Sequence, residues 1–121
     1  MLERCPILIV EDEPLIAMNL AMEVERLDGV VVGPTATVAE ALAILEETPV
    51  LGAILDANLA DREITPVARL MWKRRIPFVL HSAREIPAQL SSIIAAPAYI
   101  PKPADAAFVI RRLWEQRCAG R

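Results

Sequence analysis

Histidine and cysteine are scarce in this sequence of 121 residues. It has one histidine, His81, and two cysteines, Cys5 and Cys118, which lie near opposite ends of the chain. A multi-histidine metal site within one chain is therefore excluded, and the cysteines lack the paired spacing of zinc ligands. The N-terminal residues show no basic region, long apolar stretch or cleavage site of a secretory signal. We therefore expect a cytoplasmic protein whose two thiols stay reduced.

Long apolar runs, glycine-rich loops and excess positive charge are also missing. Hydrophobic residues make up 55% of the chain, yet no apolar run approaches the ~20 residues that span a bilayer. The formal net charge is −3, and the arginines of the C-terminal segment are interpreted as a solvated helix end. No glycine-rich loop follows the first apolar run. These absences argue against binding to membranes, against direct binding to nucleic acids and against a nucleotide site.

Short apolar runs alternate along the chain with longer segments of helical periodicity. The runs that predict strands are residues 7–10, 30–33, 50–55, 76–81 and 98–100. The segments that predict helices are residues 14–28, 37–48, 65–74, 84–96 and 104–118. Such alternation requires crossovers between parallel strands, and right-handed crossovers place helices on both faces of the sheet. We predict one α/β domain over residues 1–121, with a doubly wound, five-stranded parallel sheet.

The helix predicted over residues 14–28 has two apolar stripes. The stripe from Ile16 to Leu27 predicts the face that packs on the sheet. Leu15, Met18 and Met22 form the second stripe. This second stripe could extend the core, or it could dock a helix of a partner protein. The sequence leaves both interpretations open.

Polar and charged side chains follow four of the predicted strands. Glu11 and Asp12 follow the first, Asp56 the third, Ser82 the fourth and Lys102 the fifth. Parallel strands end at one edge of the sheet, where α/β proteins bind ligands. Three carboxylates at one point repel each other and need a cation, and Mg²⁺ suits an oxygen-rich site. With a lysine and a hydroxyl nearby, the site fits phosphoryl transfer with Asp56 as nucleophile. In a simpler alternative, Asp56 only caps the turn after its strand.

This arrangement resembles the receiver domains of response regulators in bacterial two-component signalling. The resemblance covers essentially the whole chain, and its strength lies in the order of the motifs at successive strand ends. It implies a (βα)5 flavodoxin-like fold with strand order 2-1-3-4-5, and it implies that Asp56 is phosphorylated. It also implies that Mg²⁺ is held by Glu11, Asp12, Asp56 and the backbone carbonyl of Asn58, with Asp12 the more direct ligand of the acid pair.

Further positions match the receiver pattern. The resemblance implies that Ser82 hydrogen-bonds the phosphoryl group and that Lys102 pairs with it. The Lys102–Pro103 peptide bond matches one that is usually cis in this family. Tyr99 stands where these proteins carry an aromatic side chain that moves inward on activation.

Several features depart from the usual pattern of the family. The loop after Asp56 lacks the proline and glycine often found there, and the spacing from Asp56 to Ser82 is short. Pro87 interrupts the helix predicted over residues 84–96, and Pro101 stiffens the segment beside the expected aromatic switch. We therefore predict an altered output face and intact phosphorylation chemistry.

His81 adjoins Ser82 and is a candidate catalytic base. Alternation along a strand points the two side chains to opposite faces of the sheet. We therefore interpret His81 as a packed or surface imidazole.

The function predicted from the sequence is that of a phosphoacceptor. It would take a phosphoryl group from a histidine kinase or a histidine phosphotransfer protein onto Asp56 with Mg²⁺, and slowly hydrolyse its own acyl phosphate. It would not be an enzyme with a separate substrate. Its output would pass to a partner protein for which the sequence carries no signature, or it would serve as a phosphate sink or relay. A homodimer is compatible with the sequence.

Two alternatives stay open at this point. One is a metal-dependent phosphohydrolase with an aspartyl nucleophile, although Asn58 stands where such enzymes usually need a general acid. The other is a receiver-like interaction module that is not phosphorylated.

Overall fold

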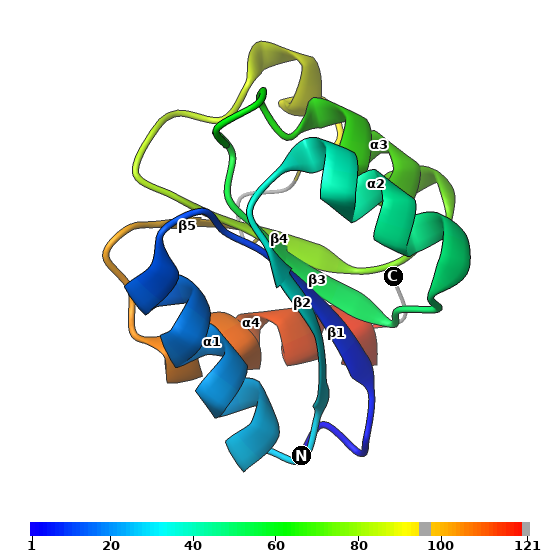
Figure 1. The fold of residues 1–121 in the computed structure, drawn as a ribbon, viewed down its shortest axis with the longest axis vertical. Coiled ribbons are helices and arrows are strands. Elements are labelled where there is room, and N and C mark those ends of the chain that lie inside the picture. The colour runs from blue at the N-terminus through cyan, green and yellow to red at the C-terminus, as the bar shows by residue number, and fades with distance from the viewer. Residues whose placement is uncertain (95–97, 120–121) are drawn as a thin grey trace.

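The fold is a parallel sheet of five strands with helices on both faces (Figure 1). The structure is a computed structural model that describes residues 1–94 and 98–119. The strands are β1 (Pro6–Val10), β2 (Val30–Thr35), β3 (Gly52–Leu55), β4 (Phe78–Ser82) and β5 (Tyr99–Pro101). All their pairings are parallel, and the order β2-β1-β3-β4-β5 confirms the predicted sheet.

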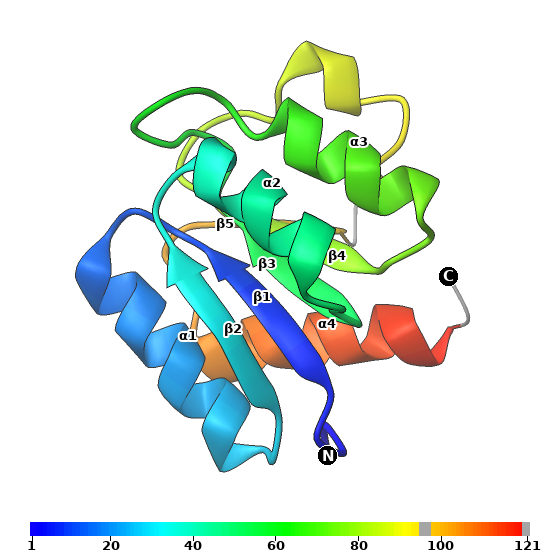
Figure 2. The same cartoon turned by 45° about the vertical axis from the view of Figure 1, so that its right-hand side comes forward.

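Two helices cover each face of the sheet. The helices are α1 (Pro14–Arg26), α2 (Val38–Glu47), α3 (Thr65–Lys73) and α4 (Ala106–Cys118). The pair α1 and α4 lies on one face, and the pair α2 and α3 lies on the other (Figure 1 and Figure 2). The five strands and these four helices begin and end within two residues of their predicted bounds.

The central strand β3 is the most enclosed part of the sheet. All its residues are buried, because it pairs with β1 on one side and with β4 on the other. Leu55 packs into the core beneath α2 and α3, and Ile54 into the core beneath α1 and α4. A strand covered on both faces is typically a continuous apolar run. Asp56 therefore comes directly after the buried run, at the carboxyl edge of the sheet.

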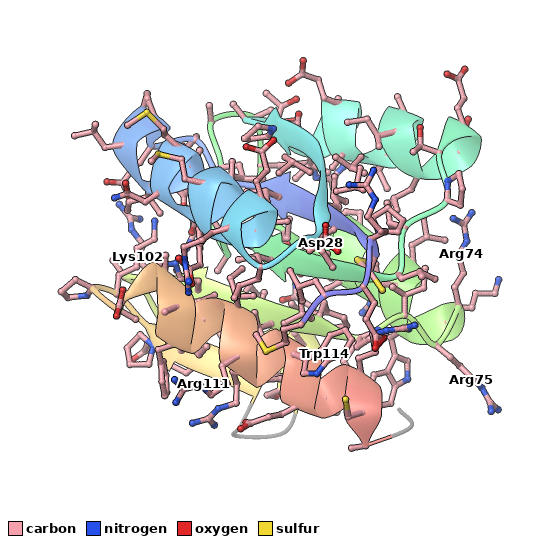
Figure 3. The ribbon with its side chains drawn as sticks, turned by 90° about the horizontal axis from the view of Figure 1, so that it is seen from below. Asp28, Arg74, Arg75, Lys102, Arg111 and Trp114 are labelled. Atoms are coloured by element: carbon pink, nitrogen blue, oxygen red, sulfur yellow. The ribbon has the colours of Figure 1, made fainter. Side chains whose placement is uncertain are left out.

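In Figure 3, which views the molecule from below, Lys102 lies at one end of the molecule, and Arg74 and Arg75 lie at the other. The two arginines follow α3 and precede the start of β4, whereas Lys102 follows the end of β5. The Lys102–Pro103 bond is cis, as predicted, and Gly33–Pro34 is a second cis bond. Among the helices of the described residues, none combines the length and the apolar character needed to cross a bilayer.

The helix predicted over residues 84–96 is wrong for the part that the structure describes, and residues 95–97 lie outside it. Only a short 3₁₀ helix, Ala88–Leu90, is present there. Pro87 has φ −53° and ψ 138°, which is not helical, and a proline also disfavours a helical conformation in the residue before it. The Ser91 hydroxyl donates to the Ala88 carbonyl at 2.8 Å and so competes with helical backbone bonding. Leu90 is fully buried and anchors the segment to the core.

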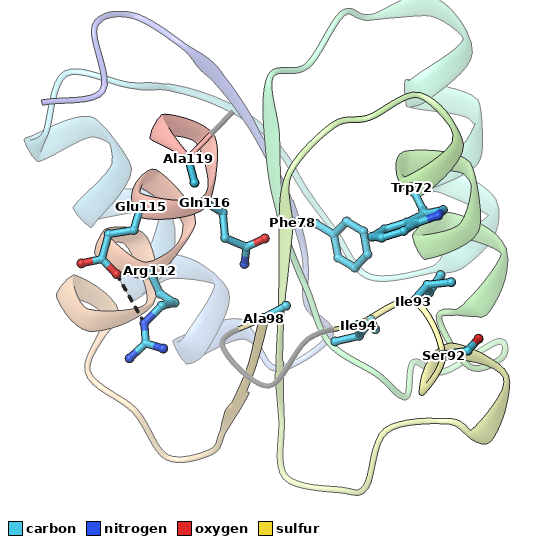
Figure 4. Close-up of a pocket in the computed structure, with 10 residues that line it drawn as sticks. All are labelled: Trp72, Phe78, Ser92, Ile93, Ile94, Ala98, Arg112, Glu115, Gln116 and Ala119. Carbon is cyan, nitrogen blue, oxygen red and sulfur yellow. Dashed lines mark ion pairs between the residues drawn. The ribbon is translucent and has the colours of Figure 1, made fainter. Parts of the chain in front are cut away.

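A groove of about 790 Å³ lies beside this segment (Figure 4). Trp72 and Phe78 form one wall, and Arg112 and Glu115 of α4 stand on the other side. The last two form an ion pair at 3.6 Å. The groove belongs to the face where the sequence predicts an altered output surface.

Candidate functional site

The residues predicted to form the site come together at the carboxyl edge of the sheet. Glu11 and Asp12 follow β1, Asp56 follows β3, Ser82 ends β4 and Lys102 follows β5. Because the strands are parallel, these positions lie at the same edge. All of them except Glu11 line one hollow of about 600 Å³, which the loop after β3 closes on one side.

The acidic side of this hollow is a tight group of carboxylates. Oxygen atoms of Glu11, Asp12 and Asp56 lie within 4.8 Å of one another. Glu11 is 4% exposed and Asp56 is 6% exposed. Burial raises the pKa of Glu11 to about 7. This effect outweighs the hydrogen bond from the Glu13 amide and the attraction of Lys102, both of which lower the pKa. Negative charge is therefore costly here without a cation.

Lys102 supplies positive charge at the centre of the group. Its Nζ lies 2.7 Å from Glu13 Oε2, 3.0 Å from Glu11 Oε1 and 3.2 Å from Asp56 Oδ2. Burial alone would lower the pKa of Lys102, but hydrogen bonds to Glu13 and Glu11 raise it above its ordinary value. Lys102 is therefore a charged counter-ion shared among three carboxylates.

The contact between Glu13 and Lys102 is missing from the sequence-based prediction. Glu13 stands at the N-cap of α1, and its amide donates to Glu11 Oε2 at 3.1 Å. Its side chain is 59% exposed, and its carboxylate makes the shortest of the Lys102 contacts. The uninterrupted acidic run of residues 11–13 before Pro14 was the available signal. The resemblance to receiver domains assigns a role only to the first two acids of that run, Glu11 and Asp12.

A chain of hydrogen bonds runs from Ser82 toward β5. Ser82 is 1% exposed, and its Oγ accepts from the Arg84 amide at 3.2 Å. The Tyr99 hydroxyl donates to the Arg84 carbonyl at 3.1 Å. The structure thus connects the two residues predicted to act as a switch, with Arg84 between them. Their movement on activation stays a prediction.

Asn58 lies next to Asp56 in the loop after β3. The Asn58 amide donates to Asp56 Oδ1 at 3.4 Å, and Asn58 pairs with Glu63 in an isolated antiparallel bridge. The backbone of Asn58 is thereby held beside the acidic group. The three carboxylates offer oxygen donors with excess negative charge, which is what Mg²⁺ prefers, and the Asn58 carbonyl stays a predicted fourth donor. The residues present therefore fit this ion.

The second apolar stripe of α1 faces solvent. Leu15, Met18 and Met22 are 72%, 50% and 60% exposed, whereas Leu20 and Val24 are buried. The interpretation of this stripe as extra core is therefore wrong. Its role as a docking surface stays a prediction.

His81 is a packed imidazole, as its place in the strand predicts. It is 3% exposed, and neither ring nitrogen has a hydrogen-bond partner among the described residues. It lines a cavity of about 650 Å³ between α1 and residues 103–106. Burial lowers its pKa. His81 is therefore set apart from the hollow that Ser82 and Lys102 line.

Known proteins with the same fold and similar sequences identify the class. No protein-family model matches the chain. The solution structure of SdrG from Sphingomonas melonis has a TM-score of 0.79 and 38% identity, over 96% of this chain and 98% of SdrG. A CheY-like response-regulator receiver protein from Methanospirillum hungatei has a TM-score of 0.83 and 25% identity, over 95% of this chain and 94% of that one. The chain belongs to the response-regulator receiver domains.

Within this family, a further likeness is to the phyllosphere-induced regulator PhyR of Methylorubrum extorquens. The two are 52% identical over 56 residues, which are 46% of this chain and 21% of PhyR. The match thus spans about a fifth of that curated relative, so the activity of the whole PhyR protein does not follow for this chain.

Proposed function

We propose that this receiver domain, residues 1–121, accepts a phosphoryl group on Asp56. The observation that carries the proposal is the 3.2 Å contact between Asp56 Oδ2 and Lys102 Nζ inside the hollow at the carboxyl edge. An aspartate with a lysine at hydrogen-bond distance and a serine on the same hollow has the parts that phosphoryl transfer needs.

In the proposed transfer, a carboxylate oxygen of Asp56 attacks the phosphorus of a phosphohistidine. The new bond joins Asp56 oxygen to phosphorus, and the bond between phosphorus and the donor's imidazole nitrogen breaks. The electron pair stays on that nitrogen. The donor's other ring nitrogen carries a proton, so the ring leaves as neutral imidazole, and Asp56 becomes an acyl phosphate. Lys102 would neutralise charge on the phosphoryl oxygens. Ser82 Oγ accepts from the Arg84 amide, so its own hydrogen is available to a phosphoryl oxygen.

Glu11, Asp12 and Asp56, together with the backbone carbonyl of Asn58, are the residues that would hold Mg²⁺. When bound, the ion supplies positive charge that offsets the charge of the carboxylates and of the transferred group. Asp12 is the member of the acid pair that lines the hollow, which supports its assignment as the more direct ligand.

The donor would be a histidine kinase or a histidine phosphotransfer protein that contacts α1. The exposed stripe of Leu15, Met18 and Met22 supports this assignment, because an apolar helix face is the kind of surface that packs against another helix. Output would pass through contacts with a partner protein, and we place the exchange in the cytoplasm. The domain itself would hydrolyse the acyl phosphate of Asp56 and so end the signal.

The alternative of a phosphohydrolase has less support. Asn58 occupies the position of the general acid, and an amide cannot give up a proton at neutral pH. Steady turnover of a small phosphoester by the wild-type protein would favour this alternative.

The decisive experiment is the intact mass of the protein after incubation with acetyl phosphate, with Mg²⁺ or with EDTA. We expect a single phosphoryl adduct that requires Mg²⁺ and is absent from Asp56→Asn. Asp28→Asn is the matched control, because Asp28 lies on the exposed loop after α1 and has a positive φ that asparagine also accepts. An adduct that persists in Asp56→Asn would contradict the assignment of the phosphorylated residue. No adduct on the wild type, together with no response to beryllofluoride, would favour the module that is not phosphorylated.

A further inference from the structure

The loop between β3 and α3 folds back on itself beside the proposed phosphorylation site. Its ends are joined by a bond of 2.9 Å from the Ile64 amide to the Ala57 carbonyl. Closer to the tip, the Leu59 amide donates to the Arg62 carbonyl at 3.2 Å. The segment is thus a short hairpin, and Asn58 stands on the arm nearest to the acidic group.

The tip of this hairpin is attached to another element by Asp61. Its Oδ1 accepts from the Val38 amide at 3.0 Å, and its Oδ2 accepts from the Ala39 amide at 3.1 Å. Both amides belong to the first turn of α2, more than 20 residues away along the chain. The same Oδ1 also accepts from the Arg62 amide at 3.0 Å. One side chain therefore joins the hairpin tip to the start of a helix.

The start of α2 has no further amide to offer, because each of its first four is used. Asp61 takes the first two amides, Thr37 Oγ1 takes that of Glu40 at 3.1 Å, and the Thr37 carbonyl takes that of Ala41 at 3.1 Å. In most helices several of these groups bond to water. Here the bond to Ala41 is the first backbone bond of the helix itself, and the loop supplies two of the three side-chain caps. The helix in turn supplies a fixed point for the loop.

The electrostatics favour the same attachment. A carboxylate at a helix N-terminus is stabilised by the amide dipoles. The backbone hydrogen bonds from Val38 and Ala39 lower the pKa of Asp61, so the side chain is charged at neutral pH. Asp61 also lines the hollow that contains Asp56 and Asn58.

We propose that Asp61 is a positioning residue: by fastening the hairpin tip to α2, it holds the Asn58 backbone in place for the metal ion. This inference rests on the proposed function, because it concerns the Mg²⁺ site described there. Asp61 itself is not a ligand in this proposal, and it acts only through the loop. A loop without this attachment would have to be ordered by the ion, and the ordering would reduce affinity.

The test is the affinity of the unphosphorylated protein for Mg²⁺, measured by isothermal titration calorimetry on the full chain. We expect Asp61→Ala to weaken binding by about tenfold, the lower end of what the loss of an outer-shell partner costs. Amide hydrogen exchange should become faster at Leu59 and Ile64, whose hydrogen bonds define the hairpin. Retention of wild-type affinity by Asp61→Ala would contradict the proposal.

Two further variants separate positioning from charge and from helix stability. Asp61→Asn removes the same negative charge but keeps one oxygen that can accept from α2, so its affinity should lie between those of wild type and Asp61→Ala. Thr37→Ala removes a different cap of α2 and should lower the melting temperature while leaving Mg²⁺ affinity within about twofold. If Asp61→Asn and Asp61→Ala weaken Mg²⁺ binding equally, the effect is one of charge. If Thr37→Ala weakens Mg²⁺ binding as much as Asp61→Ala does, the effect is one of helix stability. Either result would overturn the proposal.

The wild-type titration distinguishes the two levels of the argument. No Mg²⁺ binding by the wild-type protein would contradict the proposed function, and this inference with it. Wild-type binding that Asp61→Ala leaves unchanged would contradict the positioning role alone.

Discussion

Replacing Lys102 by methionine tests whether one cation holds the acidic group together. At an effective dielectric constant of about 20, opposite unit charges 3.0 to 3.2 Å apart attract by about 5 kcal/mol. Part of this attraction offsets the dehydration of the groups, and the net cost of leaving a buried charge unpaired is about 3–5 kcal/mol. Glu13 adds little, because its side chain is 59% exposed. We expect Lys102→Met to lower the free energy of unfolding by about 3–5 kcal/mol in EDTA.

The assay is urea denaturation followed by tryptophan fluorescence, with EDTA or with saturating Mg²⁺. An ion whose free concentration is about 100 times its dissociation constant stabilises a folded protein by about 2.7 kcal/mol. Without the lysine, the carboxylates lose a cation that repels the ion, so Mg²⁺ should stabilise Lys102→Met more than the wild type. Lys73→Met is the control, since Lys73 lies exposed in the last turn of α3, and it should change stability by about 0.5 kcal/mol or less.

Two results would refute this reasoning. A loss below about 1 kcal/mol for Lys102→Met in EDTA would mean that the pairing is worth no more than an exposed ion pair. Equal or greater stabilisation of the wild type by Mg²⁺ would mean that the lysine and the ion do not share one set of carboxylates.

Three further predictions concern the surroundings of the site. Met18→Glu should slow phosphotransfer from a phosphohistidine protein by about tenfold, equivalent to about 1.4 kcal/mol, and should leave labelling by acetyl phosphate unchanged. The control is Leu51→Glu, because Leu51 is an exposed apolar residue elsewhere on the surface. This control should change neither rate. Glu13→Gln should raise the rate of labelling by acetyl phosphate up to about fivefold. The reason is that Lys102 is no longer held by a partly exposed ion pair worth at most about 1 kcal/mol. A slower rate would show that Glu13 assists the transfer. Burial lowers the pKa of His81, so the unfolded chain binds a proton there more readily than the folded one does. The contribution of His81 to the free energy of unfolding is therefore fully present above pH 6.5 and is lost as the pH falls below it, by at most about 1.4 kcal/mol per pH unit. Urea denaturation at pH 7.5 and 5.5 should show a smaller loss for His81→Leu, and equal losses would exclude this contribution.

The sheet, and the residues that follow its strands at the carboxyl edge, could be predicted from the sequence because both follow from short-range patterns. Apolar runs that end in a charge define buried strands, and parallel strands must end at one edge. Asp56 and Lys102 are 46 residues apart in sequence, yet their contact is implied once both are placed after strands. Helix starts are equally local, as the spacing of Thr37 and Glu40 and the resulting bond of 3.1 Å show.

Contacts that depend on where a loop travels could not be predicted. Asp61 reaches the start of α2 only because the β3–α3 hairpin bends toward it, and no spacing rule connects residues 38 and 61. The helix predicted over residues 84–96 is wrong for a different reason. Its alanines and isoleucines resemble a helix in composition, but Pro87 and the Ser91 hydroxyl remove or compete for its backbone bonds, and burial of Leu90 fixes the remaining short turn.

The replacement of that helix by a short turn changes how a phosphoryl group on Asp56 could be sensed. Ser82 and Tyr99 are joined through the two polar groups of the Arg84 backbone, whose amide donates to Ser82 and whose carbonyl accepts from Tyr99. Ser82 can donate its hydrogen to a phosphoryl group from its present position. If its side chain instead rotates toward that group and its oxygen moves away from Arg84, the Arg84 amide loses its acceptor, and this peptide segment must reorient to find another. Reorientation would in turn weaken the bond that holds the Tyr99 hydroxyl. If Asp56 is phosphorylated as proposed, these hydrogen bonds through Arg84 are the connection by which the change at Ser82 would reach Tyr99 of β5.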